Sequence, residues 1–236
     1  MIYLRSTLFT IGIWLFTPIF ALVALLAFPF PPLTRYRFIS IWARCMLWWL
    51  RISCGIQYRV IGAENIPVTP SIILSKHQSM WETLAFQQIF PPQVWVLKRE
   101  LLWVPFFGWG LALTSPIAIN RGAGSKALKQ LGSQGKDRLK KGFHILMYPE
   151  GTRMAPGQRG KYHIGGAWLA HHTHSAVIPV AHNAGEFWGK HQFLKKPGTI
   201  TVSIGQPINS TDLKPDALNG QVENWIETEM SKLNSK

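Results

Sequence analysis

A histidine and an acidic residue suited to proton transfer stand close together in the segment SKHQSMWETLAF. Four residues separate His77 from Glu82, so on one continuous helix their side chains would point about 140° apart. If His77 instead lies in a loop and Glu82 in the first turn of the next helix, the carboxylate can reach one imidazole nitrogen. That contact would fix the tautomer and leave the other nitrogen free to accept a proton. We therefore expect His77 to be a general base and Glu82 its orienting acid.

Glu82 has a second possible role at the start of the same helix. Ser79 precedes Glu82 by three positions, which matches a capping box, in which the glutamate satisfies an unpaired backbone amide. Both roles require the helix to begin at the same place, so the sequence leaves both open.

Polar and charged residues also follow three further runs that we expect to be strands. Lys98-Arg99-Glu100 follows VWVL, Arg121 follows PIAIN, and Glu150-Gly151-Thr152-Arg153 follows FHILMYP. In an open, mainly parallel sheet the carboxyl ends of the strands share one edge, where ligands bind. A site with one histidine, two carboxylates and several basic groups fits proton transfer from a hydroxyl group beside a bound phosphate.

The elements that position these residues follow an α/β rhythm after Gly55. Several apolar runs are continuous rather than alternating, as in strands that are covered on both faces. Strands are expected at 57–61, 71–75, 94–97, 116–120, 143–148, 176–181 and 199–204, and helices at 81–90, 125–140, 165–174 and 221–233. The expected fold is α/β, with a mainly parallel or mixed central sheet flanked by helices, preceded by an N-terminal helical membrane anchor.

The N-terminal segment is the expected anchor. No charged residue occurs between Ser6 and Thr34, a length sufficient to cross about 30 Å of hydrocarbon as a helix. Pro18 lies in the middle and further prolines end the run, so a kinked helix that turns back is as reasonable as a straight span. A cleaved signal peptide is the competing interpretation, although only Arg5 supplies a leading charge.

The following segment has the composition of an interfacial helix. Arg37, Arg44 and Arg51 recur every seven residues beside Trp42, Trp48 and Trp49, and such side chains settle at headgroup depth. The alternative is a buried helix of a soluble domain with exposed arginines. We divide the chain into a membrane-anchoring segment, 1–54, and a catalytic domain, 55–236.

Composition also indicates a membrane and an anionic partner. Charged residues make up 15% of the 236 residues and aromatic residues 12%, while the net charge is +14. Nucleic acid, an anionic bilayer and phosphorylated substrates would all suit that charge. Four histidines are close in sequence near one expected helix end and could in principle bind a metal ion: His163, His171, His172 and His174. No Cys or acidic residue stands at ligand spacing from them, so we expect no metal.

Four motifs in order resemble the 1-acylglycerol-3-phosphate acyltransferase family of glycerolipid acyltransferases. They are His77-x4-Glu82, the Arg121 of PIAINR, the block YPEGTR at 148–153, and VIPV at 177–180. The resemblance covers about residues 60–207, and EGTR after an apolar strand is its most specific part. In one departure, the family usually has Asp where this chain has Glu82, whose side chain is one methylene longer.

The resemblance implies a membrane-bound enzyme of phospholipid biosynthesis that makes phosphatidic acid. His77 would deprotonate the hydroxyl of lysophosphatidic acid, or of another lysolipid, and acyl-CoA or acyl carrier protein would be a co-substrate, with no cofactor. The catalytic domain would face the cytoplasm at the inner membrane. The implied glycerol-phosphate site contains Arg121, Glu150, Gly151, Thr152 and Arg153, with Lys98 as a further candidate and Pro179 as a wall beside the acyl chain.

The residues also bear on Glu150 and on two other classes of function. Glu150 is more suited to holding the backbone or an arginine than to touching a dianionic phosphate, because like charges repel. A serine-type lipid hydrolase would need a nucleophile elbow, and no G-x-S-x-G occurs. A non-enzymatic binding module for anionic ligands would fit the basic charge, but no nucleic-acid-binding motif is present, so nucleic acid is not an expected partner.

Overall fold

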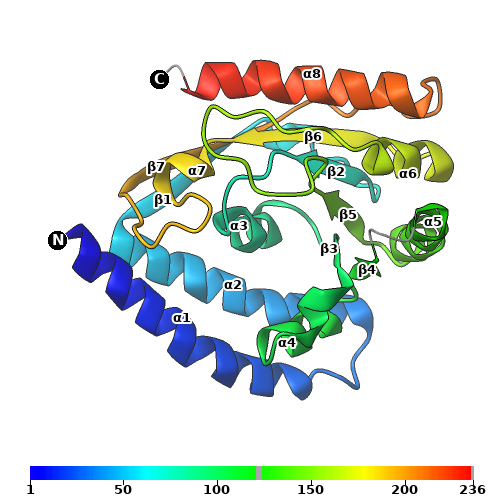
Figure 1. The fold of residues 1–236 in the computed structure, drawn as a ribbon. Helices are drawn as coiled ribbons and strands as arrows, with labels where there is room; N and C mark the ends of the chain where they lie inside the picture. Colours follow the sequence, from blue (N-terminus) through cyan, green and yellow to red (C-terminus); the bar gives the residue numbers. More distant parts are fainter. Residues whose placement is uncertain (121–123, 235–236) are drawn as a thin grey trace.

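The computed structural model describes residues 1–120 and 124–234 and contains a seven-stranded sheet with helices on both faces (Figure 1). The strand order is β1-β7-β6-β2-β5-β3-β4. The strands are β1 (Ile56–Ile61), β2 (Ile72–Ser75), β3 (Gln93–Lys98), β4 (Ile117–Ile119), β5 (His144–Met147), β6 (Val177–His182) and β7 (Gly198–Ile204). The expected strands are thus confirmed, with ends that differ by one residue.

Strand direction in the sheet decides which strand ends meet. β6, β2, β5, β3 and β4 all run parallel to their neighbours within that group. β7 is antiparallel to β6, and β1 pairs in parallel with β7, so these two strands run the other way. The sheet is mixed, and the carboxyl ends of β2, β3, β4, β5 and β6 lie at one edge.

The helices form two layers around this sheet. α5 (Ser125–Lys140), α6 (Gly165–Thr173) and α8 (Pro215–Asn234) pack on one face, and α1 (Ile2–Leu25), α2 (Pro32–Cys54), α3 (Trp81–Ile89) and α4 (Phe107–Leu113) on the other (Figure 1). β2 and β6 are buried along their whole length because helices cover both faces. The continuous apolar runs in the sequence reflect this double burial.

Some elements differ from the sequence expectation. α8 begins at Pro215, six residues before the expected start at 221, because proline suits the first turn of a helix, where its missing amide proton is not needed. α4 was not expected, since glycines interrupt its sequence FGWGLAL. Shorter elements that were also not expected are η1 (Ala63–Asn65), η2 (Arg99–Trp103) and α7 (Ala184–Phe187).

α1 and α2 form an antiparallel helical hairpin (Figure 1). Pro18 lies inside α1, which nevertheless continues to Leu25 before the chain turns back. The two helices approach closely at Gly12, where a Cβ atom would overlap the indole ring of Trp49. A larger residue at position 12 would therefore require the Trp49 side chain to move.

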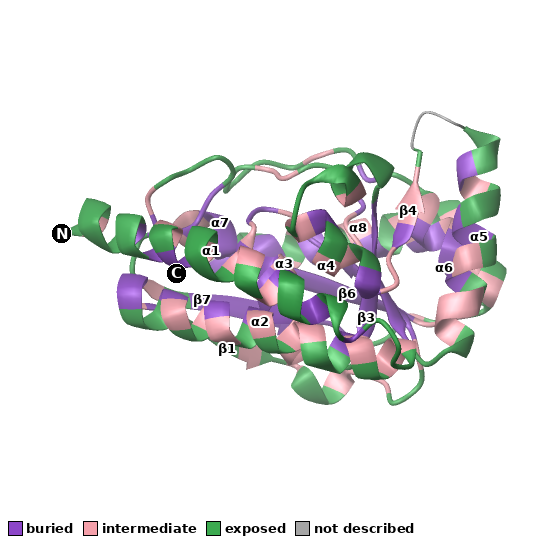
Figure 2. Ribbon diagram, turned by 90° about the horizontal axis from the view of Figure 1, so that it is seen from below, coloured by how far each residue is buried: buried purple, intermediate pink, exposed green. Residues whose placement is uncertain are grey.

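The helical hairpin is packed against the rest of the molecule. Met46 and Leu50 on α2 belong to the same hydrophobic core as the sheet, while Arg37, Arg44 and Arg51 are exposed. Much of α1 is exposed apolar surface, shown in green in Figure 2. The boundary drawn between residues 54 and 55 coincides with the end of α2 but stays a prediction, because the core is continuous across it.

Candidate active site

His77 and Glu82 meet at the carboxyl end of β2. His77 lies in the loop between β2 and α3, and Glu82 lies in the first turn of α3. Nδ1 of His77 is 2.7 Å from Oε1 of Glu82. The His77 side chain keeps 14% of its surface exposed, whereas Glu82 is fully buried. One edge of the imidazole is therefore held by a carboxylate, while part of the ring remains accessible to a substrate.

The Glu82 carboxylate accepts backbone hydrogen bonds in addition to the one from His77. The amide of Gln78 donates to Oε1 over 3.0 Å, and the amide of Ser79 lies within 3.0 Å of both oxygens. The Ser79 hydroxyl in turn accepts from the amide of Trp81. Glu82 thus holds the helix start and the imidazole at once, and the two roles left open by the sequence coexist.

The environment of Glu82 favours its ionised form. Burial by itself would raise the pKa of this carboxyl, but His182, His77 and the Ser79 amide together hold the pKa below the ordinary value of 4.5. An ionised carboxylate can only accept, so Nδ1 of His77 must carry the proton that lies between them. The free imidazole nitrogen, Nε2, is then the available proton acceptor.

Tyr148 stacks on His77 at the end of β5. The ring centroids are 3.8 Å apart and the planes are inclined by 12°. Burial, followed by the nearby Glu82 charge, raises the pKa of the Tyr148 hydroxyl well above 10, although Arg153 acts in the opposite direction. Tyr148 is therefore neutral and restricts the tilt of the imidazole, a role that sequence patterns did not indicate.

Glu150 packs against the backbone of the His77 loop, on the side away from solvent. Its side chain is fully buried, Oε2 accepts the backbone amide of His77 over 3.2 Å, and Oε1 accepts the amide of Gly160 over 3.0 Å. This geometry agrees with the expectation that Glu150 holds the backbone. A direct contact between Glu150 and substrate is not favoured by this burial.

The residues after Glu150 turn toward the surface. Gly151 has a φ of 68°, which side-chain-bearing residues rarely adopt. Thr152 is exposed and its hydroxyl accepts from Nζ of Lys190 over 3.2 Å. Arg153 is partly exposed, and within the described residues its guanidinium makes no hydrogen bond or ion pair. Arg153 therefore presents a guanidinium group without an anionic partner among the described residues, close enough to Tyr148 to influence its pKa.

The remaining candidates lie less directly at His77. Lys98 is exposed at the end of β3. Pro179 is buried in β6, where it faces Gly205 and the ring of Trp225 from α8, and this position is on the sheet face opposite to His182 because strand side chains alternate. Arg121 lies outside the described residues. The substrate contacts assigned to these three residues stay predictions.

Two buried residues near His77 were not identified as functional from sequence. Nε2–H of His182 donates to the carbonyl of Lys76 over 2.9 Å, and its Nδ1 accepts the amide of Ala184. Burial lowers the pKa of His182 below 6.5, although the Glu82 charge and the hydrogen bond to Lys76 act in the opposite direction. Lys76 is itself buried and paired with Glu150. His182 could have been found from sequence, because it directly follows the expected strand 176–181 and polar residues at the carboxyl ends of strands are candidates for a site.

Comparison with known proteins places the chain among acyltransferases. The family model described as Acyltransferase matches residues 57–183. The chain is 49% identical to the 1-acyl-sn-glycerol-3-phosphate acyltransferase of Pseudomonas aeruginosa, covering 84% of this chain and 79% of that protein. It is 30% identical to the Saccharomyces cerevisiae enzyme of the same name, with 75% of this chain and 59% of the yeast protein covered. The chain thus spans less than two thirds of the yeast relative.

A solved structure has the same fold over almost the whole chain. The crystal structure of the 1-acyl-sn-glycerophosphate (LPA) acyltransferase from Thermotoga maritima superposes with a TM-score of 0.81 and 20% sequence identity. The match covers 99% of this chain and 96% of that one. The helical hairpin is therefore part of the shared fold, along with the sheet.

Proposed function

This chain belongs to the 1-acyl-sn-glycerol-3-phosphate acyltransferase family, and on that premise we propose that it acylates 1-acylglycerol-3-phosphate to phosphatidic acid. The acyl donor is a thioester, either acyl-CoA or an acyl carrier protein. The observation that carries the proposed mechanism is the 2.7 Å contact between Nδ1 of His77 and a fully buried Glu82 carboxylate at the shared strand edge. This contact supports a general base whose Nε2 is free.

The reaction needs one proton acceptor and no covalent enzyme intermediate. Nε2 of His77 takes the proton from the acceptor hydroxyl as its oxygen attacks the thioester carbonyl. The imidazolium, stabilised by Glu82, then returns that proton to the departing thiolate. The new ester bond replaces the thioester bond, and the enzyme regains its neutral histidine.

The test of the proposed function is an acyl-transfer assay on the purified full chain. A panel of lysolipids is offered with acyl-CoA and with acyl carrier protein as donors, and product is measured by mass spectrometry. Phosphatidic acid formed from lysophosphatidic acid faster than any other product supports the proposal. Preference for another lysolipid would reassign the acceptor, and release of free fatty acid without an acceptor would indicate a hydrolase instead.

Arg153 is proposed to bind the acceptor phosphate. A guanidinium fork binds phosphate oxygens through two hydrogen bonds and stays charged at physiological pH, and the Arg153 fork has no partner among the described residues that would compete. Arg153→Ala is expected to raise KM for lysophosphatidic acid by about tenfold to 10²-fold, as for a lost charged hydrogen bond. Steady-state kinetics with varied acceptor measures this change.

The matched control for Arg153 is Arg159→Ala. Arg159 is an exposed arginine six positions later that pairs with Glu223 on α8. This control should leave the acceptor KM unchanged. An unaltered KM in Arg153→Ala would remove Arg153 from the phosphate site.

The helical hairpin is proposed to attach the enzyme to a membrane. α1 is long and apolar enough to cross a bilayer, yet one side of it packs along α2 and α4. Crossing would carry α2 into the hydrocarbon with its exposed Arg37, Arg44 and Arg51, which is costly. These contacts favour a helix that lies in the membrane interface. From the family resemblance, we propose that the catalytic domain lies at the cytoplasmic side of the inner membrane.

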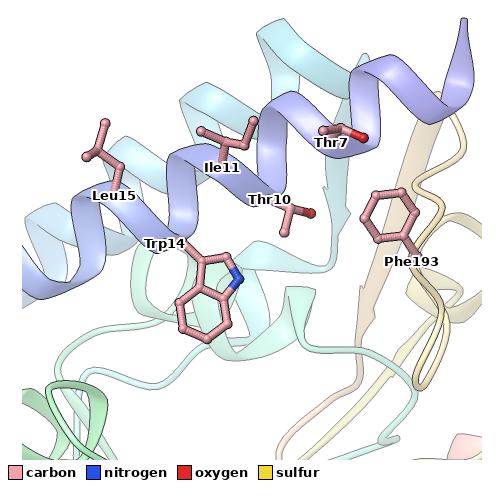
Figure 3. A pocket seen from close by; sticks show the side chains of 6 residues that line it. All are labelled: Thr7, Thr10, Ile11, Trp14, Leu15 and Phe193. Atoms are coloured by element: carbon pink, nitrogen blue, oxygen red, sulfur yellow. The ribbon is translucent and has the colours of Figure 1, made fainter.

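A hollow beside α1 adds to this apolar surface. Phe193, from the loop after α7, faces Thr10 and Trp14 across it (Figure 3). Basic residues surround Phe193 in sequence, and Lys190 and Lys196 are exposed. An exposed aromatic ring flanked by cations is suited to an anionic lipid surface.

Membrane attachment can be tested by vesicle flotation. The full chain is expected to float with anionic phospholipid vesicles, and the double variant Ile11→Lys/Leu15→Lys should lose most of this binding because both side chains are exposed on α1. Val68→Lys replaces an exposed loop residue and serves as the control. A wild-type chain that stays in the unbound fraction would contradict the proposal.

A further inference from the structure

Lys76 has an unusually complete set of partners for a buried lysine. It immediately precedes His77 and is 1% exposed. Its Nζ donates to Oε1 of Glu150 over 2.7 Å, to Oε1 of Glu227 over 2.8 Å and to the carbonyl of Gln158 over 3.0 Å. An ammonium group has three protons to donate. Each of them has an acceptor, which is the condition for keeping a lysine charged inside a protein.

Lys76 is connected to the His77 backbone through Glu150. The Glu150 carboxylate holds the backbone amide of His77, and Lys76 is the cation that neutralises Glu150. The backbone of Lys76 is also fixed, because its amide donates to Val180 and its carbonyl accepts from His182. The peptide unit that carries His77 is therefore held from both sides.

α8 enters this arrangement through Glu227. Glu227 lies near the middle of α8, 151 positions from Lys76 in sequence, and also accepts the hydroxyl of Tyr162 over 2.7 Å. Neither contact belongs to the proposed proton transfer. The C-terminal helix is thus connected to the His77 loop by a chain of ion pairs and hydrogen bonds from Glu227 through Lys76 and Glu150.

We infer that Lys76 and Glu227 are positioning residues, which hold His77 in register with Glu82 and with the acceptor hydroxyl. This inference rests on the proposed role of His77 as general base. Loss of the Glu227 contact would let Lys76 and Glu150 relax and would loosen the His77 backbone. A displacement of a catalytic group by about 1 Å is enough to slow a reaction by up to 10²-fold.

The test uses variants of Glu227, because a Lys76 variant would leave Glu150 buried without a cation and risks losing the fold. Glu227→Leu removes the acceptor, and Glu227→Gln keeps an oxygen that Lys76 can still reach. Glu223→Leu is the matched control, one helical turn earlier on α8, where the partner is the exposed Arg159. Each variant is compared with the wild-type full chain.

We expect Glu227→Leu to lower kcat by about tenfold to 10²-fold. The KM for either substrate should change by less than about twofold. Glu227→Gln should recover most of this loss, and Glu223→Leu should behave as wild type. Hydrogen–deuterium exchange of the peptide that contains the His77, Gln78 and Ser79 amides should accelerate in Glu227→Leu alone. A merely structural contact would change stability without this selective loss of kcat.

Two results would overturn the inference. One is a Glu227→Leu variant with wild-type kcat and unaltered exchange at the His77 amide. The other is a Glu223→Leu variant that loses kcat and amide protection to the same extent. If the wild type transfers no acyl group, the proposed function fails, whereas the exchange comparison still decides whether Glu227 holds the His77 loop.

Discussion

Replacing His77 by alanine is expected to lower kcat by about 10²- to 10⁴-fold, the usual contribution of a general base. The variant lacks the Nε2 acceptor, and no other described residue stands in the same position between Glu82 and Tyr148. The acceptor must then lose its proton to water. Initial rates at saturating donor and acceptor concentrations measure the loss.

The fold should survive the His77→Ala change. Glu82 would still accept the amides of Gln78 and Ser79, so the start of α3 keeps its hydrogen bonds. His172→Ala, at a histidine on α6 stacked on Trp168, is the control and should keep wild-type kcat. Turnover close to wild type in a folded His77→Ala variant would rule out His77 as the base.

Replacing Glu82 by glutamine is expected to reduce both activity and stability. The amide oxygen can still accept from His77, but the negative charge that stabilises the imidazolium is gone, so kcat should fall by about 10²-fold. The amide NH2 group would face the Ser79 amide in place of an acceptor. The resulting buried, unsatisfied donors should lower the free energy of unfolding by about 1–3 kcal/mol.

The stability difference for Glu82 should depend on pH in one direction. Because the folded protein holds the pKa of Glu82 below 4.5, ionised Glu82 contributes its full stabilisation above that pH. The contribution is lost as the pH falls through the lowered, folded-state pKa. The gap in unfolding free energy between wild type and Glu82→Gln, measured in urea, should therefore shrink below pH 4.5.

Activity and stability together separate the two roles of Glu82. A Glu82→Gln variant that melts earlier but retains wild-type kcat would show that the carboxylate serves only the helix start. A variant with reduced kcat and unchanged stability would assign it to the imidazole alone. The hydrogen bonds to His77 and to the two amides lead us to expect both losses in one variant.

Sequence by itself determined the strands, the longer helices and the group of polar residues at the strand ends. Buried parallel strands require continuous apolar runs, and these runs are visible without knowledge of their partners. YPEGTR and the His77 motif also identified the family without knowledge of the fold, because each motif consists of a few neighbouring residues. The pairing of His77 with Glu82 was also accessible, because it depends only on where α3 begins.

Only the tertiary structure decided the contacts between residues distant in sequence. Lys76 meets Glu227 across 151 positions and His182 across 106, and no local pattern encodes such distances. The same applies to α4, whose glycine-rich sequence becomes helical where it packs against α1 and α2. Helix propensity favours neither outcome strongly, so burial against neighbouring elements determines the result.

Glu82 shows how the two sources combine. Local sequence predicted that its carboxylate would either cap α3 or orient His77. In the folded chain one carboxylate does both, because the loop from Lys76 brings the imidazole and two amides to the same pair of oxygens. That convergence depends on the hydrogen bond from the His77 amide to Glu150 and on the ion pair between Glu150 and Lys76. Both contacts are properties of the packed structure.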